Sequence, residues 1–540
     1  MKRTSLAVLM IALALVALAA PMAYAQAPAP KVTINGLIDQ VGTAAWNVHN
    51  YNGLFNREDN QWYARTRGRF DIIGEVGKAK GVFGIEIDST WGQTGSADTA
   101  TGGGTQAFGT TSSFDLAVDN NPSIEVKWLY TEFPLPLIPI PTTVRLGAQP
   151  TGLAATYKLA SYFNGDFAGV NLAMTAAPNV TLRATYVAVE EGLTGTNTKD
   201  GYPVIGTGIT STQDRGDDWA YIFTAEVTPF KGLDIKPMFS GFHAQGTTSG
   251  SARSGRGGIN TGTAFAPATN HQGHIRESRY TVGLDARLRM GPFSLDPTVH
   301  YQFGHRNVIT PATFVAAGGV PGQIRKADLD AWLFDVRAGY QLGPLLLQAV
   351  GVYTTGNSAR NSTLDTVRYY QPLYTDTGYL ADWGTQLTSL GIDYLSAMNE
   401  AARFVVYPGA QIGWDKYGRA QLGAKFTYAI TPQLSAMAGI NGHWTAEEVD
   451  RNGTPTAGSG ILPNFTVSPQ ARDNSRYVGL ELMALISYRF APGVTWDNAA
   501  GYMFAGPALD GITDSPTAAP GYGRHAKDSA IISSRVRFTF

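Results

Sequence analysis

The chain is poor in several features that define common protein classes. It has no cysteine, which excludes disulfide bonds and thiolate metal sites. Charged residues make up only 15% of its 540 residues, whereas a soluble chain usually carries about 25%. The formal net charge of −1 excludes a strongly basic nucleic-acid-binding protein. Beyond the N-terminal segment, no stretch approaches the roughly 18–20 uninterrupted apolar residues of a transmembrane helix.

The N-terminal segment has the organisation of a secretory signal peptide. Lys2 and Arg3 precede an apolar run over residues 6–20, and Ala23-Tyr24-Ala25 follows as a small-residue cleavage site. We predict that residues 1–25 form a signal peptide and that residues 26–540 form one domain.

Glycine and aromatic residues are abundant, and apolar residues alternate with polar ones. Glycine accounts for 62 residues and aromatics for 11% of the chain, while the mean hydropathy is only −0.10. This combination is typical of a transmembrane β-barrel, where only every second strand residue meets lipid. Residues 62–76 place Trp62 and Ile72 on one face and Arg65 and Arg67 on the other.

Similar alternation recurs in segments of about 10–14 residues. In residues 123–130, for example, the period of two predicts Trp128 and Tyr130 on the apolar face, opposite Lys127.

The connections between these segments are of two kinds. Short ones are rich in Pro and Gly, such as Gly291-Pro292 and Gly343-Pro344, and long ones are rich in Gly, Ser and Thr. We count eighteen strand-like segments: five up to Gln149, eight up to Gly356 and five from Arg419. The predicted fold is an all-β transmembrane antiparallel β-barrel of about 18 strands, with 16 or 20 as alternatives. Short turns would face the periplasm and long loops the outside, with both termini at the short-turn end.

The C-terminal residues SSRVRFTF end on an amphipathic strand. Val536, Phe538 and Phe540 share one face, and Arg535 and Arg537 share the other. A terminal Phe preceded by alternating apolar residues resembles the assembly signal that the barrel-assembly machinery reads. The resemblance implies the outer membrane of a Gram-negative bacterium, with its lipid and lipopolysaccharide as surroundings.

Charged residues on the inner face of a barrel are candidates for lining a pore. Because arginine dominates the basic set and arginine rings select anions, we expect an electropositive stripe where Arg535 and Arg537 approach the ladder formed by residues 65, 67 and 69. Alternatively, facing charges neutralise one another, as in a pairing of Arg287 with Asp296 or of Arg69 with Asp88. The candidate pore-lining residues are Arg65, Arg67, Arg69, Arg145, Arg183, Arg287, Arg289, Arg337, Arg489, Arg535, Arg537, Glu86, Asp88, Asp285 and Asp296.

Signals for catalysis or metal binding are weak. His271 and His274 form an H-x-x-H in a Gly- and Ser-rich loop, and residues 214–218 form a short acidic cluster. The sequence contains no P-loop, G-x-S-x-G or H-E-x-x-H motif. We therefore predict no enzyme activity, no cofactor and no metal site. The longest connection, residues 357–418, is expected to fold into the barrel mouth and narrow it.

Two stretches resemble a known family. Residues 143–149 (TVRLGAQ) with residues 167–172 (FAGVNL), and residues 371–374 (QPLY) with Gly378, Tyr379 and Asp382, are similar to motifs of alginate-export-type outer-membrane porins. The resemblance implies an eighteen-stranded monomeric barrel with an arginine-rich lumen that passes anionic polysaccharide, with Arg145 as a pore residue. Ala148 and Asn171 stand where the family often has arginine, so alginate itself is not carried over.

The expected function is an outer-membrane channel for passive diffusion or export of hydrophilic, anionic solutes or oligosaccharides. The alternative is a structural or surface-recognition barrel whose lumen is plugged and whose loops bind a partner. The sequence leaves the oligomeric state, monomer or trimer, undecided.

Overall fold

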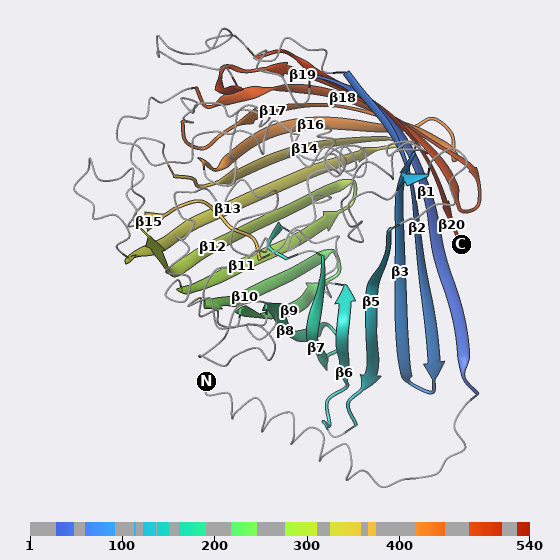
Figure 1. Ribbon diagram of the computed structural model, residues 1–540, viewed down its shortest axis with the longest axis vertical. Coiled ribbons are helices and arrows are strands. Elements are labelled where there is room, and N and C mark those ends of the chain that lie inside the picture. Colours follow the sequence, from blue (N-terminus) through green and yellow to red (C-terminus); the bar gives the residue numbers. More distant parts are fainter. Residues whose placement is uncertain are drawn as a thin grey trace, which may run out of the picture.

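Figure 1 shows the computed structural model of the chain, in which the strands run side by side around one curved sheet. No helix among the described residues is long and apolar enough to cross a membrane. The predicted signal peptide, His271, His274 and residues 214–218 lie outside the described residues. The structure describes residues 29–47, 60–91, 113–114, 123–136, 138–150, 161–163, 165–190, 218–245, 276–309, 324–357, 366–373, 417–448, 475–509 and 526–540.

The described residues contain eighteen long strands in one closed antiparallel sheet, which confirms the predicted fold and strand count. Two further strands, β4 (Ser113–Phe114) and β15 (Thr366–Val367), are two residues long and pair in parallel with β3 and β13. The long strands are β1 (Lys31–Trp46), β2 (Asn60–Val76), β3 (Ala79–Trp91), β5 (Ser123–Pro134), β6 (Thr142–Pro150), β7 (Asp166–Ala177), β8 (Val180–Glu190), β9 (Asp218–Phe230), β10 (Leu233–Gln245), β11 (Arg276–Met290), β12 (Phe293–Ile309), β13 (Ile324–Leu342), β14 (Leu345–Thr354), β16 (Arg419–Ala429), β17 (Leu434–Trp444), β18 (Tyr477–Ala491), β19 (Val494–Ala505) and β20 (Ser529–Thr539).

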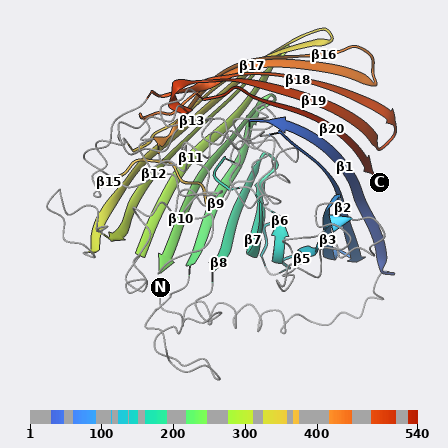
Figure 2. The same ribbon diagram turned by 45° about the horizontal axis from the view of Figure 1, so that its top comes forward.

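The first and last strands close the sheet. β1 pairs with β20 from Leu37 opposite Thr539 to Trp46 opposite Ala530. Figures 1 and 2 both show β20 lying beside β1. Closure removes the unpaired strand edges that lipid could not satisfy.

Short turns join the strands at one end of the barrel, as the Pro- and Gly-rich connections predict. The strand pairs β2–β3, β5–β6, β7–β8, β9–β10, β11–β12, β13–β14, β16–β17 and β18–β19 are joined there. In the last of these turns, Gly493 has a φ of 77°, and a Cβ on it would lie 2.3 Å from the carbonyl oxygen of Thr539. A residue with a side chain fits neither this backbone conformation nor this space.

The two faces of the sheet differ in chemistry, which defines the outside and the inside. On β2, Trp62 is 77% exposed while Arg65 is 1% exposed. Exposed apolar side chains continue around the closed sheet, as at Val282 on β11, Leu422 on β16 and Ile532 on β20. An apolar outer surface on a closed sheet without strand edges is the design of a transmembrane barrel of the outer-membrane type.

The predicted alternation is wrong at one place, in β5. The register between β3 and β5 shifts where Gly84 pairs with Trp128 and Ile85 pairs with Val126, so Lys127 is an extra residue. A bulge of this kind changes which side chains face outward beyond it. Leu129 is therefore exposed on the outer face, whereas Trp128 and Tyr130 face inward, contrary to the prediction.

Aromatic side chains form bands on the outer face at both ends of the barrel. Near the turns, the ring of Phe490 lies 5.9 Å from Trp496 and 4.9 Å from Tyr488. Near the loops, the ring centre of Tyr502 lies 4.9 Å from that of Phe504 at the end of β19. Two such bands match the two membrane interfaces that aromatic residues occupy in transmembrane barrels.

The C-terminal phenylalanine completes the turn-end band at the β1–β20 seam. The backbone N–H of Phe540 donates to the Gly36 carbonyl at 3.0 Å, and the Gly36 N–H donates back at 2.9 Å. The Phe540 ring covers Gly36 and lies 6.2 Å from Phe70 and 5.4 Å from Phe538. Phe540 therefore joins both strands of the closing seam.

We expect Phe540→Ala to lower the amount of folded barrel in outer membranes several-fold, because the substitution removes the ring that packs across this seam. The measurement is the fraction of heat-modifiable protein on semi-native gels. Phe504→Ala, an equally outward aromatic at the loop end of β19, is the matched control. Equal losses for both variants would contradict a special role of the C-terminal residue.

Candidate functional site

The inner face of the barrel carries charged and polar side chains, and their exposure changes along the strands. On β2, Arg65 is buried whereas the Arg69 side chain is 34% exposed. On β11, Arg279 is buried whereas the Arg289 side chain is 41% exposed. Inner side chains are thus more accessible toward the turn end. The predicted pore-lining residues all lie on this inner face by strand parity.

The arginine ladder of β2 is paired with acidic residues of β3. Arg67 donates to Asp88 through Nε at 2.6 Å and through Nη2 at 2.7 Å. Arg69 binds Glu86, and Lys127 Nζ lies 3.2 Å from the same carboxylate. The expected pairing of Arg69 with Asp88 is therefore wrong by two residues. Carboxylates of β3 compensate the positive charge of Arg67 and Arg69.

The closing strand brings two more arginines beside the ladder, as predicted. Asp39 on β1 lies in register between Arg67 and Arg537, and Arg537 Nη2 reaches it at 3.0 Å. Arg535 contacts Asp39 at 3.8 Å and Asp497 on β19 at 3.0 Å. Asp39 and Asp497 were not among the predicted pore-lining residues, although both follow the same alternation.

The other candidate arginines also lie beside carboxylates or near the turn end. Arg145 Nη2 lies 2.7 Å from Glu132, and its guanidinium lies 4.7 Å from the Tyr130 ring centre. Arg183 Nε lies 2.9 Å from Glu226, which Lys236 also contacts at 3.0 Å.

On β13, Arg337 Nε lies 3.3 Å from Asp335. On β11, Asp285 accepts a 2.5 Å hydrogen bond from Thr298 of β12. Arg489 is exposed near the end of β18.

The expected pairing of Arg287 with Asp296 agrees with the strand register, but Asp296 forms its ion pair with another arginine, Arg289. Leu288 pairs with Leu295, which places Arg287 and Asp296 at the next position along the two strands. Asp296, however, receives two hydrogen bonds from Arg289, one of them at 2.9 Å. Arg289 is in register with Ser294, and its long side chain reaches Asp296 two residues further along the neighbouring strand.

Two chain segments outside the long strands lie against the inner face. Residues 366–373, here called the strap, begin with β15 and continue through Tyr369, Tyr370 and Gln371. The other segment is residues 161–163, and the Leu373 N–H donates to the Tyr162 carbonyl at 2.9 Å. The described part of the long connection therefore contacts the barrel wall from the inside.

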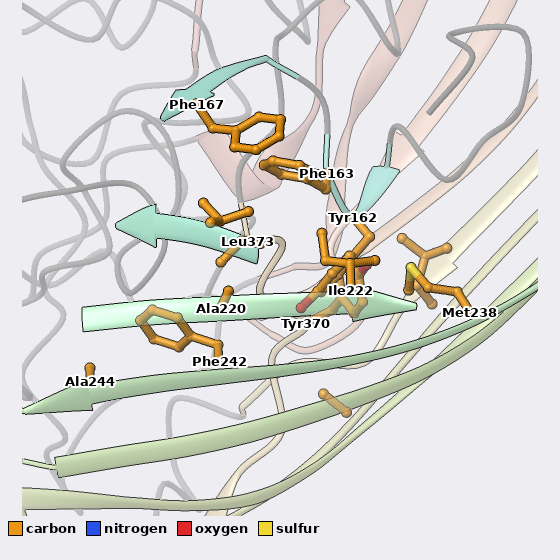
Figure 3. Close-up of a cluster of buried hydrophobic side chains, with 13 residues drawn as sticks. Tyr162, Phe163, Phe167, Ala220, Ile222, Met238, Phe242, Ala244, Tyr370 and Leu373 are labelled. Carbon is orange, nitrogen blue, oxygen red and sulfur yellow. The ribbon is translucent and has the colours of Figure 1, made fainter. Parts of the chain in front are cut away.

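An apolar patch on the wall receives both segments. Figure 3 shows Tyr162, Phe163 and Leu373 in one buried cluster with Ile222 of β9 and Phe242 of β10. All of these side chains are buried. The Tyr162 hydroxyl donates to Ser240 at 2.8 Å, and burial raises the pKa of this phenol, so it remains a donor. The rest of the inner wall is polar, and the two segments pack on this apolar patch.

Polar contacts hold the strap on β11 and β12. Arg306 Nη1 donates to the Tyr369 hydroxyl at 3.0 Å, and His300 Nδ1 lies 2.8 Å from the Tyr370 hydroxyl. Arg279 Nη1 donates to Gln371 Oε1 at 2.7 Å. Arg279 and Arg306 were not among the predicted pore-lining residues. Arg279 shares the parity of Asp285 and Arg287, which was the available signal.

Within the described ranges, no group of three or more His, Asp or Glu side chains is placed to hold a metal ion. Contacts on the inner wall are instead ion pairs and hydrogen bonds between side chains. Such an arrangement can bind and orient hydrated solutes through charge.

Comparisons with known proteins gave matches among solved structures alone. No protein-family model and no curated protein sequence matches the chain. It is similar to Pseudomonas aeruginosa OccK8 (OprE), with 12% identity over 94% of this chain and 98% of that one and a TM-score of 0.46. A BenF-like porin from Pseudomonas fluorescens Pf-5 gives 11% identity over 94% and 99% and a TM-score of 0.46. Acinetobacter baumannii OccAB1 gives 12% identity over 94% and 97% and a TM-score of 0.46. The alginate-export-type family suggested by residues 143–149 and 371–374 is not supported by these comparisons.

Proposed function

We propose that this chain is a passive outer-membrane channel for hydrophilic solutes. The observation that carries the proposal is the closed sheet of eighteen long strands with an apolar outer face and a charged inner face. Barrels of 16–18 strands are wide enough to enclose an aqueous passage. Solutes would diffuse along the ion-paired inner wall without any chemical reaction.

The same architecture indicates which parts of the barrel would contact lipid and which would face the periplasm. The outer apolar face would contact membrane lipid and lipopolysaccharide, and the short turns would face the periplasm. Val536, Phe538 and Phe540 would be read by the barrel-assembly machinery: Val536 and Phe538 are exposed on the outer face of β20, and Phe540 is exposed directly after it. Residues 1–25 would direct export and then be removed.

We further propose a modest preference for anions, including anionic oligosaccharides. Several inner carboxylates are shared by more than one cation. Glu226 contacts Arg183 and Lys236, and Glu277 contacts Arg279 and Arg306. Sharing leaves a positive bias at these places, and positive charge near a passage raises the local concentration of anions.

Planar bilayers test both parts of this proposal. The refolded chain should produce discrete conductance steps, and a salt gradient should give a reversal potential of the sign expected for an anion-preferring pore. A barrel that inserts without conducting would overturn the channel function. A cation-preferring pore would overturn the selectivity alone, and liposome swelling with neutral sugars of increasing length would measure the passage size.

A second candidate function is a recognition barrel with a plugged lumen. The strap and residues 161–163, both packed on the inner wall, favour it. In that case the inserted protein would not conduct, and its loops would bind a partner with the barrel intact.

A further inference from the structure

The apolar outer face of the barrel is interrupted by a polar patch where the sheet closes. Gln40 on β1 and Ser534 on β20 are exposed on this face, and Thr66 on β2 and Asn498 on β19 are half-buried on it. These four residues are here called the seam patch. They lie on four neighbouring strands, with Gln40 in register with Thr66 and Asn498 in register with Ser534. None of the four is charged.

The seam patch lies midway between the two aromatic bands. On β2, Thr66 is four residues from Phe70 at the turn end and four residues from Trp62 near the loops. On β20, Ser534 is four residues from Phe538. At a strand rise of about 3.3 Å and a tilt of about 40°, four residues span roughly 10 Å along the membrane normal. The seam patch therefore lies near the middle of the membrane.

The two amides of the seam patch have no hydrogen-bond partner in the barrel wall. Within the ranges that the structure describes, neither the Gln40 nor the Asn498 side chain forms a hydrogen bond. Lipid acyl chains offer no donor and no acceptor, so an exposed amide at this depth is unfavourable against lipid. Polar side chains in such positions typically pair with one another across a contact between membrane-embedded surfaces.

The surroundings of the amides leave room and polar atoms for a second surface. Gly42, in register with Ser534, is open to the outside, because a Cβ on it would meet no heavy atom within 4 Å. Small outward residues let two membrane-embedded surfaces approach closely. The hydroxyl of Ser534 accepts from Trp496 Nε1 at 2.8 Å, and that of Thr66 accepts from Trp91 Nε1 at 2.9 Å. Each hydroxyl therefore keeps its own proton for an acceptor outside the wall.

We propose that the seam patch is the contact surface for a second copy of this chain in the membrane. An amide carries both a donor and an acceptor, so Gln40 can pair with its own counterpart across a two-fold axis. In such an isologous contact one surface serves both copies, and the product is a dimer. Because the patch is uncharged, the two copies meet without repulsion between like charges.

The size of the face suits a dimer. The seam patch and its two tryptophans extend over five neighbouring strands, from β19 through β20, β1 and β2 to β3. At about 4.8 Å between strands and an apolar band about 25 Å tall, this face offers up to roughly 600 Å² per copy. The total of roughly 1,200 Å² lies at the lower end of specific interfaces. The inference goes beyond the channel function, because it concerns only the outer face.

Cross-linking of single-cysteine variants tests the inference, because the chain contains no cysteine of its own. Ser534→Cys places one thiol in the seam patch, and Val282→Cys places one at an exposed outward position on β11. Outer membranes that contain either full-length variant are treated with a short bis-maleimide. The covalent dimer should be several-fold more abundant for Ser534→Cys, because only random collisions bring two copies of β11 together.

A second substitution tests the amide itself. Gln40→Leu removes the donor and the acceptor, and leucine is compatible with lipid, so the barrel should still fold. Added to Ser534→Cys, it should lower the yield of covalent dimer about fivefold, the effect expected for losing polar side-chain contacts within a membrane. Ile38→Leu, at an exposed position of the same strand face, is the matched control and should leave the yield unchanged.

The outcomes separate this inference from the channel function. Equal dimer yields for the two cysteine variants, with heat-modifiable mobility showing that both are folded, overturn the contact surface. A yield that resists Gln40→Leu overturns the pairing of the amides. Cross-linking does not require conduction, so a dimer of a non-conducting barrel would support the contact while refuting the channel.

Discussion

Replacing Glu86 by glutamine should shift the reversal potential of the channel toward the equilibrium potential of the anion. The Glu86 side chain is 7% exposed, and it lies within ion-pair distance of Arg67, Arg69 and Lys127. Glutamine keeps the size of the side chain and removes its negative charge. The three cations then act on a passing ion with one compensating charge fewer.

The size of this effect follows from Coulomb's law. One unit charge at about 7 Å, in a medium between protein and water, changes the energy of an ion by about 1 kcal/mol. That energy corresponds to a change of about fivefold in the ratio of anion to cation permeability at low salt, and screening reduces the change at high salt. The measurement is the reversal potential under the same salt gradient for both proteins.

Asp296→Asn is the matched control for Glu86→Gln. Asp296 also lies on the inner face, but the ion pair that holds it involves Arg289, whose side chain is 41% exposed near the turn end. Solvent screens such a pair more strongly, so the control should shift the potential less. Equal shifts, or none in Glu86→Gln, would mean that the β2–β3 charges do not face the path of the ions.

The barrel could be predicted from the sequence because its signals are local. Alternation along a segment, as in residues 62–76, reflects one lipid-facing and one inward-facing side of a strand. Gly- and Pro-containing turns such as Gly343-Pro344 mark where strands reverse. Neither signal depends on distant parts of the chain, so the strand number follows from counting.

The charge pairs could not be predicted, because they depend on register. The expected pairing of Arg69 with Asp88 assumes a wider turn than the one that forms, in which Val76 pairs with Ala79. The tighter turn moves Asp88 opposite Arg67 and Glu86 opposite Arg69. The bulge at Lys127 also changes the register. Its one extra residue reverses the predicted face of every residue beyond it in β5.

The contact between the strap and residues 161–163 could not be predicted for a different reason. Tyr370 and Ser161, which contact each other at 3.4 Å, are 209 residues apart in the chain. No local pattern identifies residues 161–163 as the partner of the strap. The long connection could be expected to enter the barrel, but its seat on β9 and β10 is a property of the folded chain alone.

Replacing Tyr162 by alanine should release the strap and raise the conductance of the channel. Tyr162 is fully buried between the inner wall and the strap, next to Leu373 and Tyr370. Truncating a large buried aromatic side chain costs about 3–5 kcal/mol. Since about 1.4 kcal/mol is a factor of ten, the ratio of docked to released strap should fall by about 100-fold or more.

Single-channel conductance and hydrogen exchange over residues 366–373 should both increase in this variant if the docked strap narrows the passage. Tyr162→Phe is the matched control, because it keeps the packing and removes the hydroxyl, which donates to Ser240 at 2.8 Å. That loss costs about 1 kcal/mol, so the strap should remain docked in most molecules. Faster exchange without higher conductance would show that the strap lies beside the path of the ions, and unchanged exchange would contradict its anchoring by Tyr162. The two readings separate because exchange reports the contact between the strap and the wall, whereas conductance reports the space that the strap occupies.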